Sequence, residues 1–250
     1  MFISFRFCAK RWFAGILIAV SVIVSAALFV AAAAAVPQEL KTAFLTFDDG
    51  PSYVTPRLLE TLKKRNIKAT FFVTGQYQDY FPVLKQISDD GHVIALHSYT
   101  HDFSEIYSSS QAFWDDMARL DDLVFEITGH RAAKILRFPG GSSNTVYRRY
   151  GGGDLMHTLI DQCEQKGYAY FDWTIDTRDA LGGTVSASTI CGRVTDNIDQ
   201  VPVAVILMHD GPQQKTAPEA AETVITRLTE LGYVFDTLDN LAETVHHTVP

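Results

Sequence analysis

Short apolar runs rich in β-branched and aromatic residues alternate with longer amphipathic stretches along most of this chain. Seven of these runs have the length of a buried β-strand. They lie at Thr42–Phe47, Ala69–Thr74, His92–His97, Ile135–Phe138, Tyr168–Ile175, Val203–Met208 and Tyr233–Thr237. Between them, apolar residues recur at helical spacing. This pattern predicts helices at Pro56–Lys64, Val83–Ser88, Gln111–Ile127, Asp154–Lys166, Ser188–Ile198 and Pro218–Leu231.

The alternation of strands and helices predicts parallel β/α units, with helices covering the outside of the sheet. Seven strands favour a distorted (β/α) barrel that is closer to a TIM barrel than to an open sheet. No internal repeat, low-complexity tract or linker interrupts residues 37–250. We therefore expect an α/β fold with a single domain over 37–250.

The first 36 residues differ from the rest of the chain. Arg6, Lys10 and Arg11 precede 25 residues without a charge, Trp12–Val36. The basic flank predicts that the remainder of the chain lies outside the cytoplasm, either membrane-anchored and facing outward or secreted. The length favours an uncleaved membrane anchor over a signal peptide, while an A-x-A pattern at Ala33–Ala35 leaves cleavage open. A buried helix of a soluble protein fits this length and flank less well.

The remainder of the chain is acidic. Without residues 1–36 it keeps 18 Lys and Arg against 29 Asp and Glu, a formal charge of −11. It contains no basic cluster, which argues against nucleic acid as a partner. Cys163 and Cys191 could pair in an oxidising compartment or remain two buried thiols.

Ionisable residues follow several of the predicted strands. In β/α barrels the working residues lie at the carboxyl ends of the strands, which meet at one face. Those ends carry Asp48 with Asp49, His97, Arg137, Asp176 with Asp179, and His209 with Asp210. Ordinary surface turns would supply more Asn and Ser, and fewer histidines and arginines. These residues therefore form a candidate site.

The stretch HSYTH, residues 97–101, points to a metal ion. His97 and His101 are four residues apart, so one helical turn at the strand end would bring both imidazoles to one side. Two neutral imidazoles and one carboxylate form a known shell for catalytic zinc, with a position left open for water. An H-x-x-x-H pair alone is weak, but an aspartate at another strand end can supply the third ligand.

The stretch TFDDGPS, residues 46–52, supplies two adjacent carboxylates. Two carboxylates that leave a core together repel each other and lose hydration, and a bound cation would relieve that repulsion. A metal-dependent hydrolase needs one carboxylate as a ligand and another as the base for the proton of water. The doubled aspartate can meet both needs.

Five motifs in chain order resemble those of the polysaccharide deacetylases, carbohydrate esterase family four with its NodB homology domain. They are TFDDGPS, HSYTH, RFPGG (137–141), DTRD (176–179) and ILMHD (206–210). The resemblance covers about Thr42 to Leu241, so 37–250 is expected to be a deacetylase catalytic domain. HSYTHD and RFPGGSSN look more like bacterial peptidoglycan deacetylases than like fungal chitin deacetylases.

The resemblance implies one divalent metal ion, Zn²⁺ in the first place, with Co²⁺ or another divalent ion as alternatives. Asp49, His97 and His101 match its ligands, and Asp48 matches the catalytic base. On this division, Asp49→Asn should lose the metal. Asp48→Asn should keep the metal, lose activity and slightly raise the stability of the metal-free protein, because one of two crowded charges is removed.

The resemblance also implies four further functional residues. Arg137 matches an arginine that orients carboxylates, and the Gly140 N–H falls where the family has an oxyanion-hole donor. His209 matches the general acid that protonates the departing sugar amine, with Asp179 setting its pKa. The implied reaction removes an N-acetyl group from a hexosamine of a cell-envelope glycan, most simply peptidoglycan N-acetylglucosamine, and releases acetate. N-acetylmuramic acid or another N-acetylated polymer remains an alternative substrate.

Some positions depart from the family pattern. Gly140 stands where many members carry an aromatic residue, and Ala180 stands where a tryptophan is common. One wall of the sugar site is therefore expected to be open, although Trp173 could fill part of it. Asp210 is expected either to brace His209 or to cap its loop. His246 and His247 have no motif context and are expected at the solvated surface.

Two other functions are compatible with parts of the pattern. The motifs do not separate N-deacetylation from O-deacetylation of a polysaccharide such as xylan. An inactive, membrane-tethered glycan-binding module would have lost a base or a metal ligand, but every one of these residues is present. Ser142 and Ser143 have no base spaced to activate either as a nucleophile, which argues against a serine hydrolase.

Overall fold

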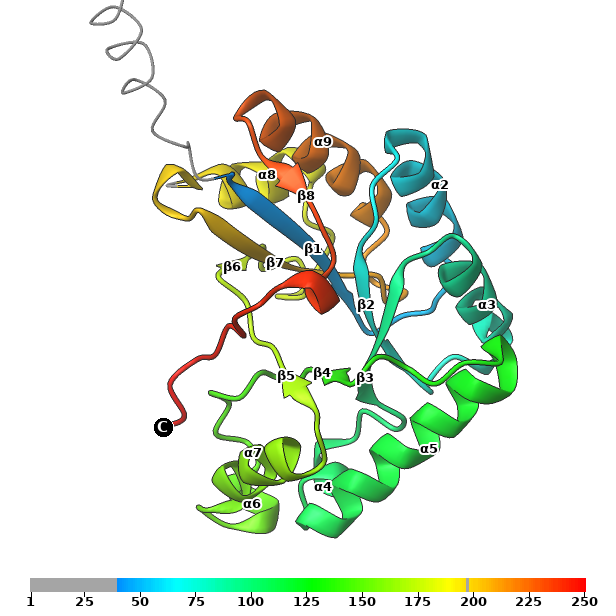
Figure 1. Ribbon diagram of the computed structural model, residues 1–250, viewed down its shortest axis with the longest axis vertical. Helices are drawn as coiled ribbons and strands as arrows, with labels where there is room; N and C mark the ends of the chain where they lie inside the picture. Colours follow the sequence, from blue (N-terminus) through cyan, green and yellow to red (C-terminus); the bar gives the residue numbers. More distant parts are fainter. Residues whose placement is uncertain (1–39, 197) are drawn as a thin grey trace, which may run out of the picture. The chain divides into compact units, whose positions relative to one another are not determined.

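Strands and helices alternate through the computed structural model as the sequence pattern predicts (Figure 1). The structure describes residues 40–196 and 198–250. The expected anchor or signal segment, 1–36, lies outside these ranges. Within them, no helix combines the length and the hydropathy that crossing a bilayer requires.

One curled parallel sheet forms the centre of the fold. Seven strands follow one another in the order β5-β4-β3-β2-β1-β7-β6, and the short β8 pairs with β1. They are β1 Thr42–Asp48, β2 Thr70–Thr74, β3 Val93–Ser98, β4 Ile135–Leu136, β5 Ala169–Tyr170, β6 Ile175–Asp176, β7 Val203–His209 and β8 Val234–Phe235. Because β5 and β6 are the outer strands of this order, the barrel is incomplete. The predicted distorted barrel of about seven parallel strands is confirmed.

Helices cover the outer face of the sheet (Figure 1). The longer ones are α2 Thr55–Arg65, α3 Pro82–Asp89, α5 Ser110–Thr128, α7 Leu155–Gln165, α8 Ala187–Thr195 and α9 Ala217–Glu230. Short turns of helix are α4 Phe103–Ile106, α6 Arg148–Gly151, η1 Gln78–Tyr80, η2 Ile198–Gln200 and η3 Leu238–Asn240. Local sequence sets the ends of α5: the Ser109 side chain accepts the Ala112 N–H, and Gly129 ends the helix in a left-handed conformation.

Alternate residues of the strands enter two apolar clusters. Leu45 and Phe47 of β1 point outward into the larger cluster, which includes Leu58 of α2 and the apolar faces of the other long helices. Phe44 of β1 points inward and joins Phe72, Ala95, Ile135, Phe171, Val205 and Leu238. Strands buried on both faces explain why they appear in the sequence as continuous apolar runs rather than as alternating ones.

The prediction of a single strand over Tyr168–Ile175 is wrong. The segment forms two strands, β5 and β6, which lie at the two outer positions of the sheet. Between them the backbone leaves the ladder: the Phe171 and Asp172 carbonyls accept hydrogen bonds from the Arg137 guanidinium. A continuous apolar run does not reveal such a break, because its polar partners come from elsewhere in the chain.

The two cysteines that the sequence left open are free thiols. Cys163 lies on the buried face of α7, and burial raises the pKa of its thiol to about 12. Cys191 on α8 is half-buried, and burial also raises the pKa of its thiol. Both therefore act as packing residues of low thiolate content.

Candidate active site

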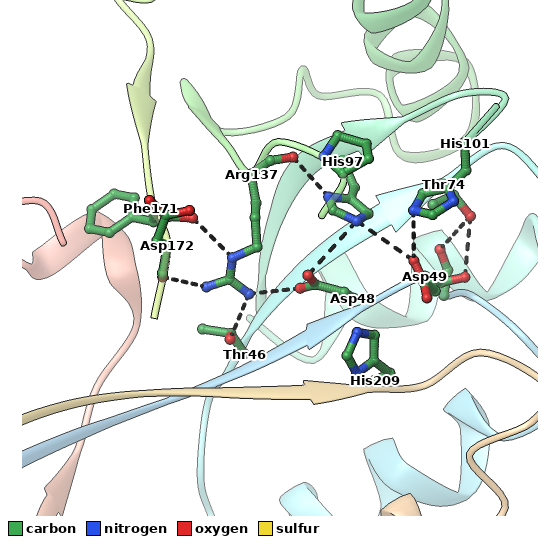
Figure 2. Close-up of polar contacts among 12 residues, drawn as sticks. Thr46, Asp48, Asp49, Thr74, His97, His101, Arg137, Phe171, Asp172 and His209 are labelled. Carbon is green, nitrogen blue, oxygen red and sulfur yellow. Dashed lines mark hydrogen bonds and ion pairs between the residues drawn. The ribbon is translucent and has the colours of Figure 1, made fainter. Parts of the chain in front are cut away.

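Residues that are far apart in the sequence meet at the carboxyl edge of the sheet. Asp48 ends β1 and lies in register with His209, which ends the neighbouring β7. His97 lies near the end of β3, and Arg137 directly follows β4. Figure 2 shows these side chains converging on the two adjacent aspartates. The structure thus brings these four strand-end residues together, whereas Asp176, at the end of β6, is exposed.

Asp49, His97 and His101 form a group that could hold a metal ion. Each offers one ligand atom, and the three atoms lie within 4.8 Å of one another. The Asp49 Oδ1 atom lies 3.6 Å from His97 Nε2 and 3.4 Å from His101 Nε2. That oxygen is buried and has no hydrogen-bond partner among the described residues. A buried carboxylate oxygen without a partner, facing two imidazole nitrogens, fits a divalent cation.

The orientation of His97 suits a ligand. Its Nδ1 lies 2.8 Å from the Arg137 carbonyl oxygen, which can only accept, so Nδ1 carries the proton and Nε2 keeps its lone pair. Burial of the ring lowers the pKa of His97, an effect that outweighs the nearby charge of Asp48. The imidazole is therefore neutral, as metal binding requires.

His101 reaches the same place by a different route from the one expected. Residues after β3 do not form a helical turn; His101 instead takes a left-handed conformation with φ 52°. Asp116 of α5 holds the loop. Its carboxylate accepts the Tyr99 N–H at 2.6 Å, the Thr100 N–H at 3.0 Å and the hydroxyl groups of Ser98 and Thr100. The two imidazole rings end 5.1 Å apart between centroids.

Arg137 and Asp48 form a buried ion pair. The guanidinium Nη1 lies 2.7 Å from Asp48 Oδ1, and the two side chains are 0% and 4% exposed. Three more guanidinium N–H groups donate to the Thr46 hydroxyl and to the Phe171 and Asp172 carbonyls. These contacts fix the orientation of Arg137, which in turn fixes Asp48 through its Oδ1 atom. The other oxygen of Asp48, Oδ2, lies 3.8 Å from His97 Nε2.

A second ion pair joins His209, which is partly buried, to the buried Asp179. His209 Nδ1 lies 2.7 Å from Asp179 Oδ1, and the backbone N–H of His209 donates to Asp179 Oδ2 at 2.9 Å. Burial alone would lower the pKa of His209. The hydrogen bond and negative charge of Asp179, with smaller contributions from Asp48 and Asp49, outweigh burial and raise the pKa to about 9. In the metal-free protein, His209 is therefore a protonated imidazolium at neutral pH.

Asp210 acts on a neighbouring loop rather than on His209. Its carboxylate accepts the Thr55 hydroxyl at 2.5 Å, and its carbonyl accepts the Ser52 hydroxyl at 2.5 Å. A Cβ on Gly50 would collide with that carboxylate, so only glycine fits beside it. Burial raises the pKa of Asp210 to about 7. Of the two expected roles, support of a loop is the one that these contacts favour.

The RFPGG loop follows Arg137 and turns at two glycines. Gly140 and Gly141 have φ of 80° and 79°, values that disfavour any residue with a Cβ. Among the described residues, the Gly140 N–H has no backbone acceptor. A Cβ on Gly141 would lie 2.8 Å from the Trp173 ring, so Trp173 packs against this loop.

Sequence reasoning missed three residues that support the site: Asp116, Asp172 and His247. Asp116 looked like one more polar residue of an amphipathic helix, and Asp172 lay inside an apparent strand. His247 was expected in solvent, but its ring packs edge-on against Trp173 at 4.7 Å between centroids. The signal available was the carboxylate within the apolar run YFDW, because a buried aspartate requires partners.

Comparison with known proteins agrees with this geometry. The family model for polysaccharide deacetylase matches residues 35–169. The putative polysaccharide deacetylase YheN of Bacillus subtilis is 33% identical over 210 residues, which cover 82% of this chain and 70% of that protein. A peptidoglycan-N-acetylglucosamine deacetylase of Bacillus cereus is 33% identical over 203 residues, which cover 80% of this chain and 70% of that protein.

A solved structure has the same fold. It is the catalytic domain of a peptidoglycan N-acetylglucosamine deacetylase from Eubacterium rectale ATCC 33656, with 36% sequence identity and a TM-score of 0.80. The match covers 87% of this chain and 99% of that domain. The ordered motifs, the curled parallel sheet and these relatives lead to one conclusion: this chain belongs to the polysaccharide deacetylase family of hydrolases.

Proposed function

We propose that this protein removes N-acetyl groups from the hexosamines of a cell-envelope glycan, with peptidoglycan N-acetylglucosamine as the substrate. The observation that supports this most is a carboxylate and an imidazole that lie side by side at one edge of the sheet, each held by a charged partner. Asp48 is held by Arg137, and the directly adjacent His209 is held by Asp179. A carboxylate that can accept a proton and an imidazolium that can donate one are what amide hydrolysis needs.

Asp49, His97 and His101 would hold one divalent cation, and we propose Zn²⁺ because one carboxylate and two imidazoles suit it. When bound, the cation supplies Lewis acidity that activates water and polarises the acetyl carbonyl. Binding it also neutralises the partnerless Asp49 oxygen and the charge crowded beside it. Metal analysis of the purified protein tests this proposal: about one zinc per chain supports it, and full activity in a metal-stripped sample contradicts it.

The chain's own residues carry the proton transfers. Asp48 accepts a proton from water as the water oxygen bonds to the acetyl carbon. The Gly140 N–H donates a hydrogen bond to the carbonyl oxygen as negative charge develops there. His209 then gives its proton to the amide nitrogen as the C–N bond breaks, which leaves acetate and a free sugar amine. Protonation matters because an amide nitrogen leaves poorly as an anion.

The relatives support the choice of substrate. The Bacillus cereus protein and the Eubacterium rectale domain both have names that specify peptidoglycan N-acetylglucosamine. The deciding experiment incubates the metal-loaded protein with peptidoglycan, chitin oligomers and acetylated xylan, measures acetate, and locates the new group by mass spectrometry. A free amine on N-acetylglucosamine supports the proposal. A free hydroxyl on xylan alone would identify an O-deacetylase, and no acetate with any glycan would indicate a binding module.

We also propose that the protein works outside the cytoplasm, tethered to the membrane by its first 36 residues. The basic flank and the uncharged run Trp12–Val36 support this location. N-terminal sequencing of the native protein tests the tether. A mature chain that starts at Val36 or Pro37 would instead indicate a secreted enzyme.

A further inference from the structure

The C-terminal tail of the chain lies against the segment that joins β5 to β6. In Figure 1 the tail runs from η3 past β5 to the C-terminus. The Asp172 N–H donates to the Val245 carbonyl at 2.8 Å. The His246 ring stacks on Tyr170 with centroids 3.7 Å apart and planes within 6°. The tail is therefore packed in place and not a free end.

Asp172 lies where this tail meets the RFPGG loop. Its side chain is fully buried, and its two oxygens accept from two different segments. Oδ1 accepts the Ser142 N–H at 2.9 Å, and Oδ2 accepts the Ser142 hydroxyl at 2.5 Å and the His247 N–H at 2.7 Å. One buried carboxylate thus ties the tail to the loop that carries Gly140.

The histidine in the tail adds a second contact with the same loop. His247 Nε2 lies 2.8 Å from the Trp173 carbonyl, so Nε2 carries the proton and Nδ1 is an acceptor. Nδ1 lies 3.3 Å from the Ser143 hydroxyl, which can donate to it. The tail therefore contacts both serines that follow Gly141, Ser142 through Asp172 and Ser143 directly.

A local turn holds part of this loop: the Gly141 N–H donates to the Phe138 carbonyl at 2.7 Å, and the Asn144 side-chain amide donates to the Gly141 carbonyl at 2.7 Å. The two glycines still make the loop costly to order, so contacts from outside it add support. Two consecutive glycines with positive φ lose more conformational entropy on ordering than other residues would. Gly140 is exposed and has no side chain to pack. On its other side, the Pro139 carbonyl accepts the Tyr107 hydroxyl at 2.8 Å. The loop is thus held just before Gly140 by Tyr107 and just after Gly141 by Asp172.

Asp172 also connects the loop with the Arg137 guanidinium. Its carbonyl accepts from Arg137 Nη2 at 2.9 Å, and the same guanidinium binds Asp48. The Asp172 backbone therefore helps to hold the arginine that binds the proposed base, Asp48. Its side chain helps to hold the loop that carries the proposed oxyanion donor, Gly140.

We propose that Asp172 is a positioning residue that, together with the tail segment Val245–His247, fixes the Gly140 N–H where negative charge develops in the reaction. This inference rests on the proposed deacetylase function. Asp172 does not touch the substrate; it acts through Ser142. Its loss should affect the transition state more than substrate binding, because the oxyanion forms only during the reaction.

The first test replaces Asp172 by Asn, which keeps the shape but removes one acceptor. We expect kcat for acetate release to fall about 10- to 100-fold, as for a misplaced catalytic group, with KM and metal content unchanged. Asp121→Asn is the matched control, because Asp121 also accepts a loop N–H, that of Ala132, but does so at the amino end of β4. A kcat within about twofold of wild type, or an equal loss in the control, would refute the proposal.

The second test leaves Asp172 intact and changes the tail. His247→Pro removes the N–H that Asp172 accepts, whereas His247→Ala keeps this N–H and removes only the imidazole. We expect kcat to fall clearly further in the Pro variant than in the Ala variant. Equal values would show that the tail is not coupled to the site through Asp172. This pair also covers the case in which Asp172→Asn does not fold.

Hydrogen exchange separates this inference from the proposed function. The Ser142 and His247 amides should be protected in the wild-type protein and should both exchange faster in Asp172→Asn, while peptides of β1 are unchanged. This readout does not depend on activity. If the wild-type protein releases no acetate, the proposed function fails while the loop–tail link can still be tested. Unchanged exchange of both amides would overturn the link even in an active enzyme.

Discussion

Replacing Asp179 by Asn should remove the proton that His209 is proposed to donate. The pKa of His209 in the metal-free protein is about 9: burial lowers it, and the hydrogen bond and charge of Asp179 more than offset burial. An Asn of the same shape keeps an acceptor but loses the charge. The pKa of the imidazole should then fall to its ordinary value of about 6.5 or lower, because burial remains and its main opposing charge is gone.

The size of the effect on activity follows from these two values. At pH 7.5, a pKa of about 9 leaves about 97% of the imidazole protonated, and a pKa of 6.5 leaves about 9%. Acetate release should therefore fall at least about tenfold at this pH, and more if the remaining imidazole is poorly oriented. A bound cation opposes the charges of Asp48 and Asp49 and lowers the pKa in both proteins, so the measurement compares the alkaline limbs of their pH–rate profiles.

The same pair should make stability depend on pH. Because the folded pKa lies above the unfolded value, the stabilisation is fully present below about pH 6.5 and is lost as pH rises through about 9. A pKa of about 9 in the folded protein against 6.5 in the unfolded chain corresponds to about 3 kcal/mol, or about 6–12 °C in Tm for a domain of this size. Metal-stripped Asp179→Asn should thus melt well below wild type at pH 6, and the gap should narrow by pH 9.5.

Asp176→Asn is the matched control for both measurements. Asp176 lies three residues earlier and is exposed, and among the described residues its carboxylate accepts only the nearby Arg178 N–H, at 2.8 Å. It should keep the wild-type activity and pH profile. The reasoning is refuted if Asp179→Asn retains full acetate release with an unshifted alkaline limb, or if its Tm deficit is the same at pH 6 and pH 9.5.

Three further predictions concern the candidate metal group and its support. Asp49→Asn should lose most bound metal, whereas Asp48→Asn should keep the metal and lose activity; metal analysis paired with acetate release checks both, and equal metal loss would refute the division. Asp48→Asn should also lower the Tm of the metal-free protein, while Asp49→Asn should leave it unchanged or raise it; calorimetry of the stripped variants decides. Asp116→Ala should weaken metal binding about 10- to 100-fold, as is usual for residues that support ligands, and a metal titration at wild-type affinity would contradict this.

The sequence predicted the sheet well because long strands buried on both faces leave an unambiguous apolar run. β1 and β7 lie within a residue of their predicted bounds. The segment 168–175 failed because its apolar residues belong to two strands at opposite outer positions. What separates the strands is a set of hydrogen bonds that the segment accepts from Arg137 and donates to the C-terminal tail. No local sequence pattern indicates partners so far away in the chain.

Some residues of the candidate site could likewise be predicted from the sequence, and others could not. Asp49, His97 and His101 could be predicted because metal ligands need particular residue types at strand ends, and those types are rare there by chance. Asp116 could not, because an aspartate on a helix is ordinary until its partners are known. For Asp172 the apolar run around it indicates burial, but not which groups its carboxylate binds. Both turned out to hold loops whose shape depends on backbone N–H groups, which every residue has and which the sequence therefore cannot mark.

For the two adjacent aspartates, buried partners decide how a neutralising substitution changes the stability of the metal-free protein; their mutual repulsion alone does not. Considered as an isolated pair, the two carboxylates repel each other, so neutralising either one removes repulsion. From the sequence, Asp48→Asn is therefore expected to raise the stability of the metal-free protein slightly. The structure reverses it for Asp48, whose carboxylate is the charge partner of a guanidinium that is 0% exposed. Breaking a buried pair by removing one partner typically costs about 3–5 kcal/mol, because the remaining charge is left without compensation. Asp49 has an oxygen with no partner within the described chain, so the metal-free protein loses nothing comparable when that charge is removed. One aspartate is therefore held by the protein itself, and the other is left to be completed by a cation.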